Sequence, residues 1–174
     1  MPRKIEAVRS AINLQVNWMG DRAKEAVSRF MQGYNCAQAV SSVFAGDAGV
    51  PEEVVLCAAT GFGAGAGRTG GTCGAVSGGV LAIGLLVGST GADEKEAREW
   101  TYGLTREFIT RFTLKRGTVS CSELLGCDLS TGEGLDRARK QNLTRTLCPL
   151  YVRDAVDILE EILASVTSGQ PQAR

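Results

Sequence analysis

The segment that most constrains the fold runs from Cys73 to Gly91 and contains no charged residue. Apolar side chains dominate it, and glycines recur at positions 74, 78, 79, 84, 88 and 91. Its nineteen residues are borderline in length for a membrane span, and the remainder of the chain has the charged composition of a globular protein. We therefore predict a buried central helix without membrane insertion, whose glycines allow neighbouring helices to pack closely.

Helical periodicity extends through most of the chain, which predicts an all-α fold around this central helix. Thr72 is expected to cap the central helix, and Pro51 and Pro149 each suit the first position of another one. Asp93 and Glu96 have the spacing of a capping box and are predicted to begin the longest helix. The predicted helices cover residues 3–18, 21–31, 35–44, 51–61, 73–87, 93–112 and 149–166, with a short turn at 121–125.

The chain length of 174 residues suits one compact multi-helix domain. We predict an N-terminal helical extension at residues 1–20, the helical domain at 21–166 and a frayed C-terminal tail at 167–174. Residues 61–71 contain too many glycines for a stable helix and are predicted to form a loop.

The composition excludes several functional classes. Lysine plus arginine equals aspartate plus glutamate at 19 each, and this neutral balance argues against nucleic-acid binding. The chain has no histidine, which excludes Ser-His-Asp and Cys-His catalysis. The first residues lack the apolar stretch of a secretory signal, so we expect a cytoplasmic location. In that compartment thiols stay reduced, and cysteines more often serve catalysis, metal binding or redox sensing than structural stapling.

Most of the six cysteines lie at or beside predicted helix starts. These cysteines are Cys36, Cys73, Cys121 and Cys148. Unpaired backbone N–H groups and the helix dipole stabilise a thiolate at such a position and lower its pKa. We therefore predict that these four are reactive. Cys57 lies in an apolar run and is expected to be a buried core residue, and the role of Cys127 stays open.

The spacing of the cysteines does not fit the familiar metal modules, because the chain contains no C-x-x-C pair. A four-thiolate zinc or iron–sulfur site assembled from distant helices remains open as an alternative. Gly65, Gly67 and Arg68 belong to a G-x-G-x-x-G match that lacks the strands of a dinucleotide-binding fold. We interpret them either as a turn between helices or as a site where backbone N–H groups and Arg68 approach an anion or a thiolate near Cys73.

Several segments taken together resemble one known family. They read GYNCAQAV at 33–40, GFGAG at 61–65, TCGAVSG at 72–78, CSELLG at 121–126 and CP at 148–149. Over about residues 21–165 the chain resembles the redox-active proteins named C_GCAxxG_C_C after their cysteine pattern. The four cysteines of that name fall on the four selected above, while Cys57 and Cys127 are additional. The central motif here reads Cys-Gly-Ala where the name has Gly-Cys-Ala. The resemblance implies a helical fold, a redox role for the four cysteines and, from the neighbouring genes of family members, an association with membrane transporters.

Three functions remain open at this stage. The first is thiol–disulfide exchange or electron transfer with a redox partner protein, in which Cys73 attacks because the glycine loop exposes it. Cys36, Cys121 and Cys148 would then be its resolving partners. The second is binding of zinc or an iron–sulfur cluster by the same four thiolates. The third is an accessory role for a membrane transporter. A homodimer is compatible with the glycine-rich helix and the amphipathic last helix.

Overall fold

The computed structural model describes residues 21–167, and within this range the regular structure is helical apart from one isolated β-bridge. The predicted all-α class is therefore confirmed. The predicted extension at 1–20 and residues 168–174 of the predicted tail lie outside the described residues. The elements are α2 (Asp21–Met31), α3 (Cys36–Ser42), α4 (Ala45–Ala48), α5 (Glu52–Ala59), the 3₁₀ turn η2 (Thr60–Phe62), α6 (Gly63–Ala66), α7 (Gly74–Val87), α8 (Lys95–Arg116), α9 (Cys121–Leu125), α10 (Gly132–Lys140) and α11 (Leu143–Thr167).

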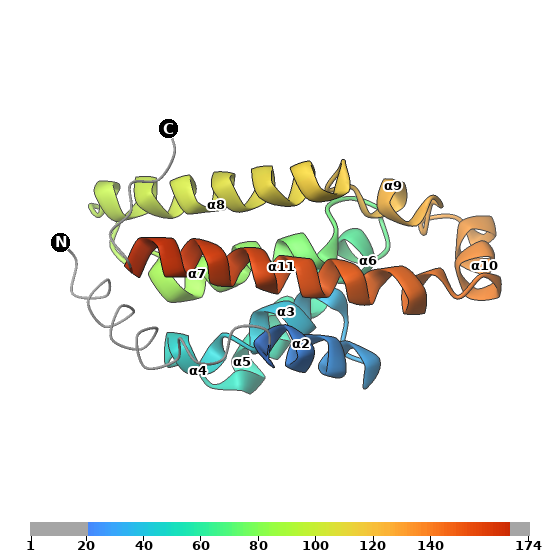
Figure 1. The fold of residues 1–174 in the computed structure, drawn as a ribbon, viewed down its shortest axis with the longest axis horizontal. Helices are drawn as coiled ribbons and strands as arrows, with labels where there is room; N and C mark the ends of the chain where they lie inside the picture. The colour runs from blue at the N-terminus through green and yellow to red at the C-terminus, as the bar shows by residue number, and fades with distance from the viewer. Residues whose placement is uncertain (1–20, 168–174) are drawn as a thin grey trace.

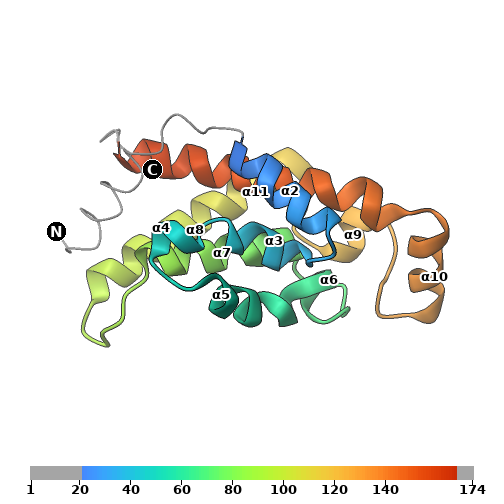
Figure 2. The ribbon, with the colours of Figure 1, turned by 90° about the horizontal axis from the view of Figure 1, so that it is seen from below.

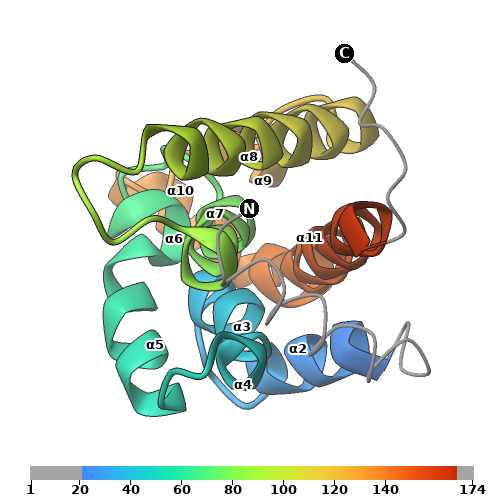
Figure 3. The same cartoon turned by 90° about the vertical axis from the view of Figure 1, so that its left-hand side faces the viewer.

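The helix α7 lies among the other long elements. It contacts α3, α8 and α11, and α11 also packs along α2 (Figure 1). Viewed end-on, α8 covers one side of α7, α11 a second side, and α3 with α4 a third (Figure 3). The short helices α9 and α10 lie beyond the C-terminal end of α8, at the end of the molecule where α11 begins (Figures 1 and 2).

Glycines in α7 permit this close packing. A Cβ atom at Gly78 would lie 2.6 Å from the carbonyl oxygen of Ala37 in α3, and one at Gly79 would collide with the ring of Phe108 in α8. A Cβ atom at Gly74 would lie 3.1 Å from the Cβ of Cys36. Larger residues would therefore push α3 and α8 away from α7, because protein interiors have few gaps that absorb added volume.

The predicted apolar face of α8 is present, with Leu104, Phe108 and Phe112 buried against the core. Its predicted start is wrong, because the cap residue is Glu94 and no side chain caps the helix. The Glu94 carboxylate instead accepts hydrogen bonds from the backbone N–H groups of Thr90 (3.0 Å) and Gly91 (3.3 Å) in the preceding turn. The predicted capping box is therefore absent.

The longest described helix is α11 with 25 residues, not α8 with 22, so that prediction is wrong. It begins at Leu143, and Pro149 lies inside it rather than at its first position. The carbonyl oxygen of Asn142 starts the helix by accepting hydrogen bonds from the N–H groups of Arg145 and Thr146, both 3.0 Å. An apparent proline start signal thus marks a position well inside the helix.

None of the helices within residues 21–167 combines the length and the apolar character needed to cross a bilayer. In α7, residues such as Val76, Ile83 and Leu86 are buried by neighbouring helices of the same chain. Most of α7 is therefore covered by protein, whereas Gly84 and the end of the uncharged segment at Thr90 and Gly91 are exposed.

Candidate functional site: a cavity lined by four cysteines

A side-chain cap fixes Cys36 at the first position of α3. The Asn35 carboxamide oxygen accepts hydrogen bonds from the N–H groups of Ala37 (2.9 Å) and Gln38 (3.0 Å), and the Gln38 side chain returns a bond to the Asn35 N–H. The Asn35 amide nitrogen also donates to the carbonyl oxygen of Thr60, at 3.0 Å. This capping box begins α3 at the start of the helix predicted at 35–44, and it holds Cys36 against the first residue of α7, Gly74.

A β-bridge brings Cys73 and Cys121 to the same place. Thr72 and Ser120 form an isolated antiparallel bridge, flanked by hydrogen bonds from the Cys73 N–H to the Val119 carbonyl and from the Cys121 N–H to the Gly71 carbonyl, both 2.7 Å. Thr72 therefore pairs with another segment instead of capping α7, and Cys73 itself is the cap residue. Cys121 opens α9, as predicted.

The glycine-rich segment packs against Cys121. Its composition predicts a loop, and the structure forms the 3₁₀ turn η2 followed by α6, a tight turn in which Ala64 and Gly65 have left-handed backbone angles. Gly65 has a φ of +71°, and a Cβ atom there would lie 2.8 Å from the Cβ of Cys121. Glycine adopts this left-handed conformation readily, and the lack of a Cβ atom is what admits Cys121 so closely. Gly67 and Arg68, the other predicted anion-binding residues, are exposed and do not line the cavity described below, so their predicted role remains a prediction.

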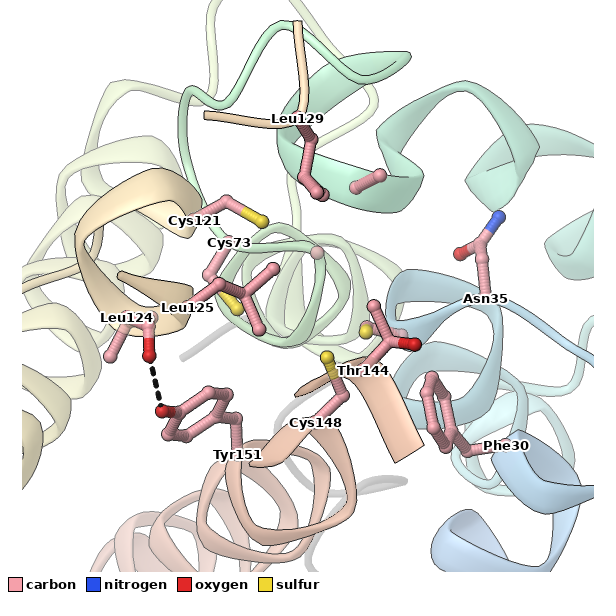
Figure 4. A pocket seen from close by; sticks show the side chains of 13 residues that line it. Phe30, Asn35, Cys73, Cys121, Leu124, Leu125, Leu129, Thr144, Cys148 and Tyr151 are labelled. Carbon is pink, nitrogen blue, oxygen red and sulfur yellow. Dashed lines mark hydrogen bonds between the residues drawn. The ribbon is translucent and has the colours of Figure 1, made fainter. Parts of the chain in front are cut away.

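Cys148 projects from α11, past the first turn of that helix, so its predicted position at a helix start is wrong. One turn further along, the Tyr151 hydroxyl donates a hydrogen bond to the carbonyl oxygen of Leu124 at 2.7 Å (Figure 4). The guanidinium of Arg116 lies 5.2 Å from the centre of the Tyr151 ring. These contacts fix the start of α11 against α9 and against the end of α8.

The four signature cysteines line one cavity of about 140 Å³. In Figure 4, Cys148 lies at its floor, Cys73 and Cys121 lie along one wall, and Asn35, Thr144 and Phe30 lie on the opposite side. The four thiols are between 3% and 7% exposed. No charged side chain belongs to the lining, which consists of Phe30, Asn35, Cys36, Ala64, Cys73, Gly74, Cys121, Leu124, Leu125, Leu129, Thr144, Cys148 and Tyr151.

Burial opposes the predicted activation of Cys73. It raises the pKa of this thiol from its ordinary value of 9.0 to about 11, although hydrogen bonds from the N–H groups of Ala75 and Val76 act in the opposite direction. The helix-start effect is thus present but weaker than the cost of placing a charge in an apolar cavity. Burial likewise raises the pKa of Cys121 to about 12. The expectation that the glycine-rich segment leaves Cys73 accessible is wrong, because this cysteine is only 3% exposed, and its role as the attacking thiol remains a prediction.

Cys36 and Cys148 interact as a pair of neighbouring buried thiols. The Cys36 thiol stabilises a thiolate on Cys148 and so lowers the pKa of Cys148, and the same interaction raises the pKa of Cys36 well above its ordinary value. Cys73 and Cys121 are close enough for their charges to raise the pKa of Cys36 further. Among the four cavity cysteines, Cys148 is the one whose pKa is lowered.

The two remaining cysteines, Cys57 and Cys127, do not line the cavity. Cys57 is exposed on α5, which contradicts its predicted place in the core, and Cys127 is buried after α9 without lining the cavity. Within residues 21–167, no three side chains among cysteine, aspartate and glutamate converge as metal ligands.

Sequence reasoning missed the aromatic residue that completes the cavity. Tyr151 follows Cys148 by three positions, a spacing that places both side chains on one face of a helix. This spacing would have identified Tyr151 as a neighbour of the cysteine, had α11 been predicted to begin before Cys148.

Comparison with known proteins gives one match. The family described as "Putative redox-active protein (C_GCAxxG_C_C)" matches residues 34–162, which include all four cavity cysteines. The chain belongs to this C_GCAxxG_C_C family. No curated protein matches the chain. No solved structure matches it either. The matched residues include the four cysteines that line the cavity, and the family is described as redox-active.

Proposed function

We propose that the protein carries out thiol–disulfide exchange through Cys148 and Cys36. The observation that carries the proposal is that these two thiols line one cavity, where the interaction with Cys36 lowers the pKa of Cys148. A thiolate is the species that attacks a disulfide, and a second thiol in contact with it is placed to resolve the mixed disulfide.

In the proposed cycle, the Cys148 thiolate attacks one sulfur of a substrate disulfide. A bond forms between Cys148 and that sulfur, the substrate S–S bond breaks, and the other sulfur leaves as a thiolate that takes up a proton. The Cys36 thiol then loses its proton and attacks Cys148, which releases the second substrate sulfur as a thiol. Two electrons and two protons pass from the protein to the substrate, and the protein gains a Cys36–Cys148 disulfide.

Cys73 and Cys121 supply a second dithiol in the same cavity. Their pKa values of about 11 and 12 keep both protonated at neutral pH, so they are poor first nucleophiles. We propose that they reduce the Cys36–Cys148 disulfide in a second exchange and thereby store an additional electron pair. The bridge between Thr72 and Ser120 supports this assignment, because it holds the two cysteines near each other before oxidation.

The test counts oxidised cysteines and metal on the same preparation. Protein purified without oxygen is treated with a disulfide oxidant, alkylated under denaturing conditions with and without prior reduction, and weighed intact, with metal analysis in parallel. We expect two or four cysteines to resist alkylation until reduced. Cys148→Ser and Cys36→Ser should each remove the first protected pair, and Cys57→Ser, which changes an exposed cysteine outside the cavity, should not.

Two outcomes would overturn the proposal. The first is free alkylation of all six cysteines after oxidant treatment. The second is about one metal ion per chain that is lost in Cys148→Ser, which would support the alternative of a thiolate zinc or iron–sulfur site. The redox partner, the transporter association, the homodimer and the cytoplasmic location remain predictions from the sequence.

A further inference from the structure

A second cavity adjoins the cysteine cavity. It has a volume of about 260 Å³ and shares two lining residues, Phe30 and Thr144, with the first. Both shared residues lie on the side of the cysteine cavity opposite Cys121 (Figure 4). The other lining residues of the second cavity are Met31, Gly33, Tyr34 and Arg145. The pair Phe30 and Thr144 therefore separates an inner cavity, which holds the thiols, from an outer one at the surface.

The inner cavity selects for a small uncharged group. Its lining contains no charged side chain, and moving an ion from water into such surroundings without a partner carries a large free-energy penalty. A volume of about 140 Å³ is close to that of an apolar cavity that admits one benzene molecule. The group that meets the thiols is therefore apolar and about the size of a single ring.

The outer cavity selects for a different chemistry. Arg145 is exposed there and is the only charged residue among those that line either cavity within the described chain. Met31 and Tyr34, which are 46% and 38% exposed, offer apolar surface beside it. A guanidinium binds a carboxylate through charge-assisted hydrogen bonds, so this cavity fits an apolar chain that ends in an anionic group.

We infer that the substrate is a small amphipathic disulfide: a neutral cyclic disulfide at the inner cavity, a short aliphatic chain passing Phe30 and Thr144, and a carboxylate at Arg145. This inference rests on the proposed function and names the substrate class for it. The exchange balances without another reagent. The Cys36 and Cys148 thiols become a disulfide, the ring S–S bond opens, and the substrate leaves as a dithiol that carries the two electrons and two protons.

The test compares three disulfides as oxidants of the fully reduced, full-length protein. Lipoic acid carries a five-membered disulfide ring and a carboxylate, lipoamide has the same ring with a neutral amide, and glutathione disulfide carries charged groups near its sulfur atoms. Samples are quenched with acid, alkylated and weighed to follow formation of the first protein disulfide. The rate of each disulfide is divided by its rate with a small free thiol, because ring strain alone speeds the opening of a five-membered disulfide. We expect this normalised rate to be more than about tenfold higher for lipoic acid than for glutathione disulfide, because the inner cavity excludes charge.

Arg145→Gln isolates the contribution of the outer cavity. It should slow the reaction with lipoic acid by about 1.5- to 5-fold, the range of an exposed ion pair, and leave the rate with lipoamide unchanged. The matched control is Arg153→Gln, which removes an exposed arginine of the same helix that lines neither cavity and should change neither rate.

The outcomes separate this inference from the proposed function. A normalised rate for glutathione disulfide as high as that for lipoic acid, or an unchanged lipoic acid rate in Arg145→Gln, overturns the substrate class while exchange at Cys148 still stands. If none of the three compounds, nor the general thiol oxidant diamide, produces a Cys36–Cys148 disulfide, both the function and the inference fail.

Discussion

Replacing Gly78 with alanine tests whether the close contact between α7 and α3 shapes the cysteine site. The added Cβ atom would lie 2.6 Å from the carbonyl oxygen of Ala37 and 2.9 Å from its Cα atom. Both are backbone atoms, so no side-chain rotation relieves the contact, and α3 must shift. Gly84 provides a matched control in the same helix, because nothing lies within 4 Å of a Cβ atom there.

The expected magnitude follows from two terms. Alanine favours a helix over glycine by about 0.8–1.0 kcal/mol, and this gain applies to both variants. Only Gly78→Ala also has an overpacking cost, which is about 1–3 kcal/mol for an added methyl group in a packed core. The helix-propensity gain cancels in the comparison, so Gly78→Ala should be less stable than Gly84→Ala by about 1–3 kcal/mol. For a chain of this length the difference corresponds to about 2–12 °C in Tm.

The assay is urea unfolding of the reduced proteins at 25 °C, followed by circular dichroism, with the wild type beside both variants. Gly84→Ala should be at least as stable as the wild type. A shift of α3 would also displace Cys36, so Gly78→Ala should form the Cys36–Cys148 disulfide more slowly under the same oxidant. Equal stability of the two variants would refute the argument that the glycines of α7 are required for close helix packing.

Three further predictions address the cavity. The alkylation rate of Cys73 in the native protein should rise with pH, with a midpoint near pH 11. The free energy of unfolding should fall between about pH 9 and 11, because in this range the Cys73 thiol loses its proton in the unfolded chain but keeps it in the folded protein. Gly65→Ala should destabilise more than Gly67→Ala: both residues have positive φ, but only at Gly65 would the new Cβ atom meet Cys121. Tyr151→Phe removes the hydrogen bond to α9 and should cost about 1 kcal/mol while speeding hydrogen exchange in residues 121–125.

Each of these predictions has a contrary result. A Cys73 alkylation midpoint near pH 9 would show that burial does not control this thiol. Equal unfolding free energies for the Gly65 and Gly67 variants would show that the contact with Cys121 is not restrictive. Unchanged exchange in α9 of Tyr151→Phe would show that the hydroxyl does not hold this helix.

The sequence predicted helix limits and buried helix faces where these depend on residues close together in the chain. The helix at 21–31 was predicted with its observed limits, and the helix predicted from residue 35 does begin there, with Asn35 as its cap residue. The buried face of α8 also followed from its periodicity. The helix-start argument and the family motif selected the same four cysteines, and the structure brings all four to one cavity.

Features that depend on distant segments were not predictable in the same way. The helix-start argument correctly identified N–H groups near Cys73, but the desolvation that outweighs them comes from α9, α11 and the glycine-rich segment. Cys57 lies in a continuous run of apolar residues from Val54 to Ala59. Such a run has no alternation of apolar and polar residues, so the sequence does not show which side of the helix is buried. In α5 the buried face is formed by Val55 and Ala59, four positions apart, and Cys57 falls on the other side.

Pro149 interrupts the hydrogen-bond ladder of α11 directly after Cys148. Proline has no amide hydrogen, so the carbonyl oxygen of Arg145 receives no bond from position 149. Beyond the proline, Val152 and Val156 are fully buried and anchor the helix in the core. A disulfide requires the two sulfur atoms to approach to about 2 Å, closer than a hydrogen bond between thiols. In the proposed exchange cycle we therefore expect the turn that carries Cys148 to make this small movement, while the buried part of α11 keeps its packing.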